Sequence, residues 1–247
     1  ARRDTAPPTV TIDKPSTSGL YRNSLLSITG NATDPSSTSK IKEVHYAVRD
    51  LTLGTTYWDG SNTWVVSGTT YWVTLSSTAG NYFSPADNTN ITWSTGAVSF
   101  TSGRYYKISA RGKDVPGNET ADGGCPVKYF YYDTDKPTTT IANVIKGNVY
   151  SSLPTISGSA GDNGSPNQAG VKKVEVQISY PGNNYWSPWT GWTTPTAVWY
   201  SSSPELGNIY SDGVWSTTSS WTNDKTYTIK YKGEDFSYDD SEAQNGN

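Results

Sequence analysis

An internal duplication constrains the fold of this 247-residue chain more than any other feature of its sequence. The segment Asp4–Ile12 recurs as Asp133–Ile141, and Ile28–Asp34 recurs as Ile156–Asp162. Collinear matches with nearly constant spacing indicate a tandem repeat. We therefore predict two copies of one domain, residues 1–133 and residues 134–247. The further matches join Ile41–Val48 to Val171–Ile178, Tyr57-Trp58 to Tyr185-Trp186, Trp93 to Trp221, and Tyr106–Asp114 to Tyr227–Asp235.

Both copies carry the sequence pattern of β-strands. In residues 44–48 and 174–178 the apolar side chains fall on every second position, which is typical of half-buried antiparallel strands. Thr, Tyr, Trp and Val are abundant, and clusters of Gly, Asn, Asp, Ser and Pro divide the runs. No window carries a sustained helical stripe. The predicted fold class is all-β, with two tandem immunoglobulin-like β-sandwich domains.

Composition limits the classes of partner. The net charge is -3 and the isoelectric point is about 5.2, so no basic field exists to attract nucleic acid or an anionic membrane. No apolar run approaches the roughly 20 residues of a membrane span. Aromatic residues make up 13 % of the chain, which supplies enough ring surface for a packed core and argues against disorder. The expected partners are other copies of the same repeat or chain, a glycan, or a surface protein.

The rarest residues argue against catalysis. Cys125 and His45 are the single cysteine and the single histidine, so neither an internal disulfide nor a zinc site of several Cys and His can form. His45 lies out of phase with the apolar Val44 and Tyr46 and is expected to face solvent. No Ser/His/Asp or Cys/His set can be assembled around it, so we predict a protein that is not an enzyme.

Three segments resemble a known family. Asp4–Pro8, Ile28–Asp34 and Tyr106–Asn118 are similar to the opening, an inner strand and the closing strand of immunoglobulin-like repeats in tandem arrays of bacterial cell-surface proteins. The resemblance covers nearly the whole chain, although the closing turn of the second copy, Asp235–Asp240, lacks the Gly-Asn of the pattern. It implies an extracellular, non-enzymatic structural or adhesive repeat, within a stalk or filament. The alternative is a carbohydrate-binding or accessory module of a secreted glycan-active enzyme.

Two sets of residues are candidate binding sites. Trp189, Trp192 and Trp199 have no evident counterpart in the first copy, and aromatic anchors often dominate binding surfaces, so they form a candidate platform for a glycan or a protein. Core packing is the alternative. The acidic residues near the joint between the copies are candidate Ca²⁺ ligands, because Ca²⁺ takes six to eight oxygen ligands; ordinary turn chemistry is the alternative. These residues are Asp133, Asp135 and Asp162, while Asp34, Asp114 and Asp235 lie in comparable turns.

The second copy is expected to lack its final strand. In the first copy the strand-like run Pro126–Tyr132 follows Asp114, but the same distance beyond Asp235 passes residue 247. Three explanations compete: a repeat of different length, a fragment of a longer array, or a strand donated by a neighbour. The fragment is favoured, and strand donation is second.

Overall fold

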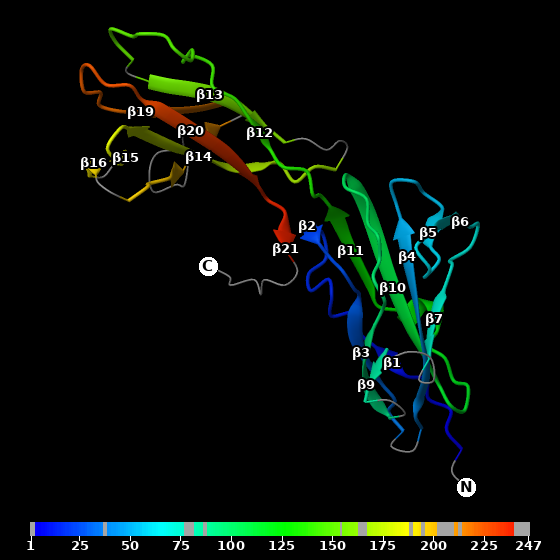
Figure 1. The fold of residues 1–247 in the computed structure, drawn as a ribbon. Coiled ribbons are helices and arrows are strands. Elements are labelled where there is room, and N and C mark those ends of the chain that lie inside the picture. Colours follow the sequence, from blue (N-terminus) through cyan, green and yellow to red (C-terminus); the bar gives the residue numbers. More distant parts are fainter. Residues whose placement is uncertain are drawn as a thin grey trace. The chain divides into compact units, whose positions relative to one another are not determined.

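The computed structural model shows an all-β chain, which confirms the predicted fold class (Figure 1). Apart from strands, the described residues contain one short 3-10 turn, Asp122–Gly124. The chain forms two compact units, which adjoin in sequence between Thr134 and Asp135. The structure describes every residue except 1–2, 37–38, 77–81, 86–87, 154, 163–166, 188–189, 194–195, 202–209, 212–213 and 240–247.

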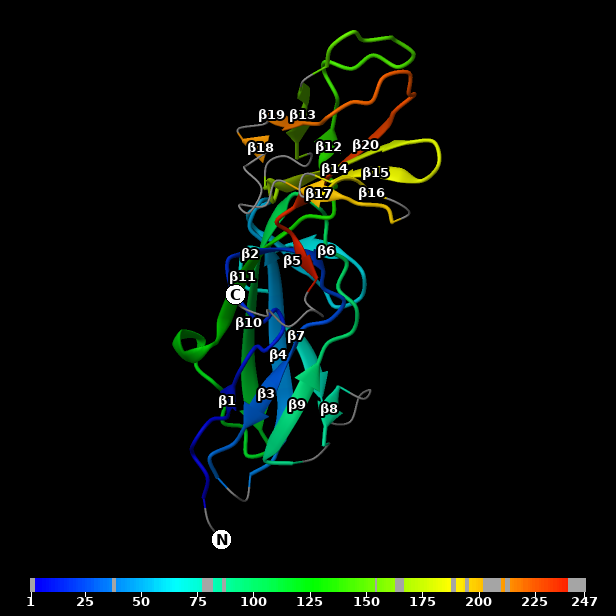
Figure 2. The same cartoon turned by 90° about the vertical axis from the view of Figure 1, so that its left-hand side faces the viewer.

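The first unit is an immunoglobulin-like sandwich of two sheets, which Figure 2 shows as two layers of strands. One sheet has the order β1-β3-β9-β8, and the other has the order β21-β2-β11-β10-β4-β5-β6, with β7 also paired to β4. The strands are β1 (Thr9–Val10), β2 (Leu20–Ser24), β3 (Thr29–Thr33), β4 (Ile41–Asp50), β5 (Thr56–Trp58), β6 (Trp64–Val66), β7 (Val73–Ser76), β8 (Phe83–Ser84), β9 (Asn90–Ser94), β10 (Arg104–Asp114), β11 (Val127–Tyr132) and β21 (Tyr238–Asp239).

The core of the first unit lies between these sheets. On β4 the residues predicted to face inward are buried, since Val44 and Val48 are fully buried and Tyr46 is 3 % exposed. Ala47, which the alternation places on the outer face, is also buried. β10 lies between β4 and β11, and Phe130 of β11 is fully buried opposite Tyr106 of β10. The last predicted strand of the first copy therefore forms and closes this core.

The second unit repeats the arrangement, with fewer strands among its described residues. One sheet has the order β12-β13-β19-β18, and the other has the order β16-β15-β14-β17, with β20 also paired to β14. The inward residues of β14, namely Val174, Val176 and Ile178, are fully buried as predicted. The strands are β12 (Thr138–Thr139), β13 (Thr155–Gly161), β14 (Val171–Tyr180), β15 (Asn184–Ser187), β16 (Gly191–Thr193), β17 (Tyr200–Ser201), β18 (Tyr210–Ser211), β19 (Val214–Thr218) and β20 (Thr228–Asp235).

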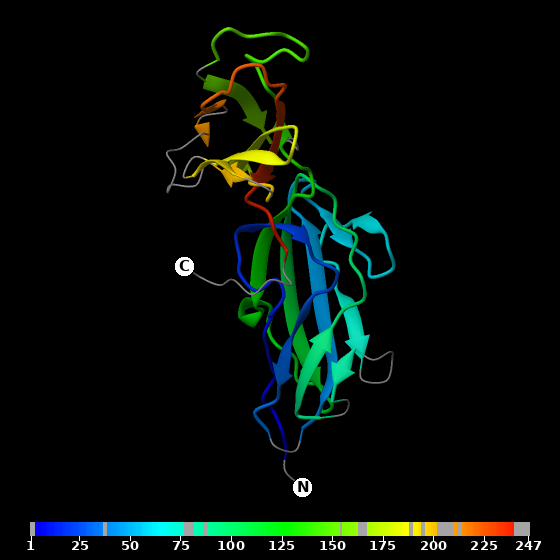
Figure 3. The same cartoon turned by 60° about the vertical axis from the view of Figure 1, so that its left-hand side comes forward.

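An aromatic cluster is built in the same way in both units. In the first unit, Trp64 packs on Trp58 with ring centroids 5.5 Å apart and on Tyr106 at 5.4 Å. In the second unit, Trp192 makes the equivalent contacts at 5.5 and 5.4 Å, from the yellow β15–β16 hairpin of Figure 3. Each indole also donates a 3.0 Å hydrogen bond to a backbone carbonyl, that of Ser99 or Ser220. Trp192 is therefore the counterpart of Trp64, contrary to the expectation that it had none.

The strand pairing also corrects one sequence match. On β9, Trp93 lies opposite Gly30, and on β19 the residue opposite Gly158 is Trp215. Trp215, and not Trp221, is thus the counterpart of Trp93. A Cβ on Gly30 would lie 2.7 Å from the Trp93 ring and still closer to the Thr11 carbonyl oxygen, so both the indole and the neighbouring backbone require glycine there. The sequence match failed because the loop between the two positions differs in length between the copies.

Candidate metal centre

Three carboxylates from separate segments converge in the first unit. Asp4 lies in the segment before β1, Asp34 directly follows β3, and Asp114 is the last residue of β10. One carboxylate oxygen from each lies within 4.8 Å of the others. Asp114 is fully buried and Asp34 is 5 % exposed, so two of these charges are removed from water.

Turns at the ends of the strands hold the carboxylates in place. One Asp114 oxygen accepts hydrogen bonds from the backbone N–H groups of Gly117 and Asn118 at 2.7 and 2.6 Å, and the Asn118 side-chain amide donates to the other at 2.7 Å. Asp34 accepts the Ser36 N–H at 2.8 Å. Asp4 accepts the Ala6 N–H at 3.0 Å and the hydroxyl of Ser39. Each carboxylate is therefore oriented by its own turn.

The remaining oxygen of Asp34 lacks a donor. Its Oδ2 atom is buried and has no hydrogen-bond partner among the described residues. Burial raises the pKa of Asp34, and the negative charges of Asp4 and Asp114 raise it further, while the Ser36 N–H opposes them. The hydroxyl of Ser39 lowers the pKa of Asp4. A buried, like-charged group with an unsatisfied oxygen is costly unless a cation lies beside it.

The donor set suits a hard divalent cation. All three ligands offer carboxylate oxygens, and no sulfur or imidazole is present, which favours Ca²⁺ or Mg²⁺ over zinc or copper. Ca²⁺ tolerates an irregular ligand arrangement filled out by carbonyls and water, whereas Mg²⁺ demands near-octahedral geometry. Ca²⁺ therefore fits best a cluster whose ligands come from three separate turns.

The acidic residues that the sequence predicted as Ca²⁺ ligands are not the ones that converge in this cluster. Asp133 belongs to the first unit, where it is fully buried and accepts a 3.3 Å hydrogen bond from Ser102. Asp135 and Asp162 belong to the second unit, and Asp162 accepts the Gly170 N–H at 2.5 Å. No single unit contains this set, so Ca²⁺ binding by Asp133, Asp135 and Asp162 stays a prediction.

The internal repeat gave one indication of the cluster that forms. Asp4, Asp34 and Asp114 correspond in the internal repeat to Asp133, Asp162 and Asp235. Three acidic positions are thus shared by the two copies. Asp4 was the ligand that the sequence interpretation missed, because nothing in the sequence places the N-terminal segment beside the end of β10.

The predicted tryptophan platform divides into three cases. Trp192 packs in the aromatic cluster of the second unit, and this packing accounts for the residue without a ligand. Trp199 is 36 % exposed, and the ammonium group of Lys232 lies 4.7 Å from its ring. The first unit repeats this contact between Arg111 and Trp72 at 4.3 Å. Trp189 lies outside the described residues.

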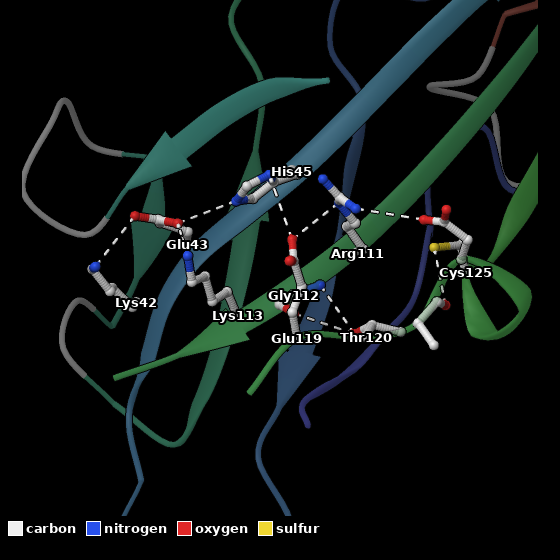
Figure 4. A network of polar contacts seen from close by, with 11 residues as sticks. Lys42, Glu43, His45, Arg111, Gly112, Lys113, Glu119, Thr120 and Cys125 are labelled. Carbon is white, nitrogen blue, oxygen red and sulfur yellow. Dashed lines mark hydrogen bonds and ion pairs between the residues drawn. The ribbon is translucent and has the colours of Figure 1, made fainter. Parts of the chain in front are cut away.

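A second polar network surrounds His45 on the outer face of β4 and β10 (Figure 4). His45 lies 3.2 Å from Glu43 and 3.8 Å from Glu119, and Arg111 contacts Glu119 at 3.1 Å. The His45 side chain is only 14 % exposed, so it faces outward as expected but is largely covered by these partners. Through Glu119 the network joins the loop after β10 to the sheet. Among the described contacts, it brings no hydroxyl or thiol nucleophile to the histidine ring.

Comparison with known proteins gives little information about function. No family model matches the sequence, and no curated protein matches it. One similar solved structure is titled "Crystal structure of CBD12 from CALX1.2"; the match covers 91 % of this chain and 75 % of that one, with 11 % identity and a TM-score of 0.30. So low a score carries no argument about ligands or partners. The described part of the chain contains no helix with the length and apolar character that a membrane crossing needs.

Proposed function

We propose that this chain is a non-enzymatic structural or adhesive repeat of an extracellular bacterial surface protein, and that Ca²⁺ clamps its first unit. The observation that carries the proposal is the convergence of Asp4, Asp34 and Asp114, with a buried Asp34 oxygen that has no donor among the described residues. A cation there would tie the N-terminal segment to the ends of β3 and β10. The ladder between β1 and β3 ends at Thr9 and Thr33, so the cation would hold the segment before β1 beyond the last pair of that ladder.

The chemistry supports an extracellular setting. Extracellular modules bind Ca²⁺ with dissociation constants on the order of 10⁻⁴–10⁻³ M, which is useful only where free Ca²⁺ is abundant. All three ligands already accept backbone N–H groups, which weakens their attraction for a cation. A site of this kind is expected to be of the weak, extracellular type. The resemblance of Asp4–Pro8 and Tyr106–Asn118 to bacterial surface repeats agrees with this setting.

Thermal unfolding and calorimetry of the whole chain test the proposal. After chelation, Ca²⁺ at about 100 times its dissociation constant should stabilise the first unit by about 2.7 kcal/mol, on the order of 10 °C in melting temperature. Asp34→Asn should abolish this response. Asp122→Asn, whose side chain is 85 % exposed, should retain it and serves as the control.

The stoichiometry of binding adds a second test. One Ca²⁺ per chain, lost in Asp34→Asn, would support the clamp alone. A second ion, lost in Asp162→Asn, would also support the prediction for Asp133, Asp135 and Asp162. An unchanged melting temperature together with no heat of binding at 10 mM Ca²⁺ would refute the clamp.

A further inference from the structure

The outer face of the larger sheet in the first unit carries a stack of tyrosine rings. The strands β2, β11 and β10 are neighbours in this sheet (Figure 1). Tyr21 of β2 lies opposite Tyr131 of β11, and Tyr131 lies opposite Tyr105 of β10. The ring centroids are 4.8 Å apart in the first pair and 4.3 Å apart in the second, with interplanar angles of 22° and 20°. Three partly exposed rings from three strands therefore form one row.

The stacking determines which part of each ring a ligand can reach. Neighbouring strands lie about 4.8 Å apart, close to the centroid distances, so the ring faces are turned toward one another. Ring edges, which carry positive partial charge, and hydroxyl groups are left for a ligand. A nucleic-acid base would need a free ring face on which to stack. The row therefore favours an anion or an acceptor oxygen.

The hydroxyl of the central strand is suited to donate a hydrogen bond. Burial raises the pKa of Tyr105, and electrostatic interaction with Tyr131 and Tyr129 raises it further. The ring of Tyr129 is the fourth member of this group, with its centroid 6.0 Å from that of Tyr105. The Tyr105 hydroxyl therefore keeps its proton at neutral pH.

Two cations lie next to the tyrosine row. Lys107 follows Tyr105 on the same face of β10 and lies directly opposite Arg49 of β4. Arg49 donates to the Gly54 carbonyl at 2.5 Å and lies 5.7 Å from the Tyr57 ring, contacts that leave its charge without a counter-ion. None of the ion pairs among the described residues includes Lys107 or Arg49. Like charges directly opposite one another destabilise a sheet, so an anion placed beside them would stabilise it.

The other end of the same face gives a comparison. There Arg111 contacts Glu119 at 3.1 Å, and Lys113 contacts Glu43 at 3.7 Å, in the network of Figure 4. The cations at that end are thus neutralised by carboxylates of the chain. Within the described part of the chain, no carboxylate does the same for Lys107 and Arg49. An anion from another molecule would supply the missing charge.

We propose that the face formed by Tyr21, Tyr105, Tyr131, Lys107 and Arg49 binds an acidic polysaccharide. The two cations contact its carboxylate or sulfate groups, and the tyrosine hydroxyls donate to its oxygen atoms. A polysaccharide is favoured over a peptide, because peptides are commonly bound at a sheet edge or in a groove, whereas these residues lie on the face of a sheet. The face is separate from the carboxylate cluster and does not depend on the Ca²⁺ clamp.

Calorimetric titration of the whole chain with dextran sulfate and with polygalacturonate, in a chelator at low salt, tests the proposal. Both polymers should bind saturably, and neutral dextran should not bind. The net charge of the chain is -3, so attraction is confined to this face and should weaken as salt screens it.

Charge variants locate the binding face. Lys107→Gln and Arg49→Gln should each weaken binding about tenfold, because each removes a charge-assisted hydrogen bond. Lys146→Gln removes the same charge from an exposed position of the second unit and should leave the affinity unchanged. In the unaltered chain, the polymers should shift the NMR signals of backbone amides on β10 and β11.

A hydroxyl variant separates binding from packing. Tyr105→Phe keeps the ring stack and removes one donor, so it should weaken binding about threefold. Its melting temperature should stay that of the unaltered chain, since the aromatic contacts with Tyr131 and Tyr129 are retained.

The outcomes distinguish the possible ligands. No saturable binding of either acidic polysaccharide, or binding that Lys107→Gln and Arg49→Gln leave unchanged, would overturn the proposal. Equally tight binding of neutral dextran would also overturn it, because the cations would then play no part. Tighter binding of poly-glutamate that both variants remove would assign the face to an acidic protein instead. Since a chelator is present throughout, a failed Ca²⁺ titration leaves these results unaffected.

Discussion

The two units contain the same aromatic cluster but differ in how completely they close over it. Trp64 and Trp192 make matching ring contacts and matching hydrogen bonds to backbone carbonyls. Ile108 is nevertheless fully buried, whereas Ile229 in the corresponding strand is only partly buried. The cluster is set by residues on β5–β6 or β15–β16 and one tyrosine, while closure of the core depends on one further strand.

This difference shows that one sequence pattern gives two levels of burial. Local pairing of the hairpin brings its tryptophan rings into contact in both units. Full removal of the β10 side chains from water needs β11, because that strand brings Phe130 into the core. The first unit is thus expected to be the more stable of the two, since buried apolar area is the main favourable term in folding.

The largest expected effect comes from removing the side chain that distinguishes the two units. Phe130→Ala should lower the free energy of unfolding of the first unit by about 3–5 kcal/mol, because it leaves a cavity beside Phe100 and Tyr106. Denaturation followed by amide exchange on β10 measures the loss. Val127→Ala on the same strand is the control, since Val127 is 43 % exposed and should cost less than about 1 kcal/mol. A loss below that value for Phe130→Ala would mean that β11 does not explain the difference.

The next effect tests whether the paired tryptophans are equivalent. Trp64→Ala and Trp192→Ala should each destabilise their own unit by about 2–3 kcal/mol, less than for a fully buried ring, because both indoles are partly exposed. Trp199→Ala should cost less than about 1 kcal/mol, since its ring lies at the surface. Chemical denaturation measures all three. If Trp192→Ala left stability unchanged but removed fluorescence quenching by a polysaccharide, the ring would serve a ligand and not the core.

Much of the fold could be predicted from the sequence, because it depends on local patterns. The alternation over residues 44–48 and 174–178 gave the central strands, and the run Pro126–Tyr132 gave β11. The equivalence of Trp64 and Trp192 was missed because no neighbouring residues match, although their spacing of 128 residues equals that of other matched segments.

The carboxylate cluster could not be predicted in the same way. Its members come from three turns that only the folded sandwich brings together, and turn conformation depends on hydrogen bonds such as those of Asp114 to Gly117 and Asn118. Periodicity carries no information about such contacts. The internal repeat indicates which acidic residues are retained, but it does not indicate which of them meet.

Two corresponding glycines, Gly112 on β10 and Gly233 on β20, allow the same substitution to be compared in both units, with a smaller expected effect on stability. A Cβ on Gly112 would lie 2.9 Å from Val10 and 3.0 Å from Pro8, and a Cβ on Gly233 would lie 2.9 Å from Thr139 and 3.0 Å from Pro137. Gly112→Ala and Gly233→Ala should therefore each cost about 1–2 kcal/mol in their own unit, since the contacting side chains must shift. Denaturation midpoints measure both effects.

Matched controls exist in each unit for this test. Gly96 and Gly161 have no heavy atom within 4 Å of a built Cβ, so alanine there should change stability little. A loss of stability in Gly112→Ala without any loss in Gly233→Ala would show that the segment of Pro137 and Thr139 packs less tightly on β20 than the segment of Pro8 and Val10 packs on β10. The two units would then differ at this contact as well as in the burial of Ile108 and Ile229.

The smallest effect concerns the charge of Asp34 in metal-free protein. Its pKa is raised by burial and by the carboxylates of Asp4 and Asp114, so the folded state holds the Asp34 proton more tightly than the unfolded state does. The resulting stabilisation is present below the ordinary pKa of 3.8 and is lost as the pH rises through the raised value. Asp34→Asn should therefore be more stable than the unaltered chain at pH 7 in a chelator, by less than about 1 kcal/mol.

The higher stability of Asp34→Asn at pH 7 in a chelator should depend on pH and on Ca²⁺ in two ways that a general change in packing would not reproduce. It should disappear near pH 3, where Asp34 is already protonated in both folded and unfolded chains, and it should reverse in saturating Ca²⁺, because the variant loses the ligand that the cation needs. Melting temperatures at pH 3 and pH 7, with chelator and with Ca²⁺, give all four values. A variant that is less stable at pH 7 without metal would show that Asp34 is a satisfied turn residue and that the cluster carries no unpaired charge for a cation to neutralise.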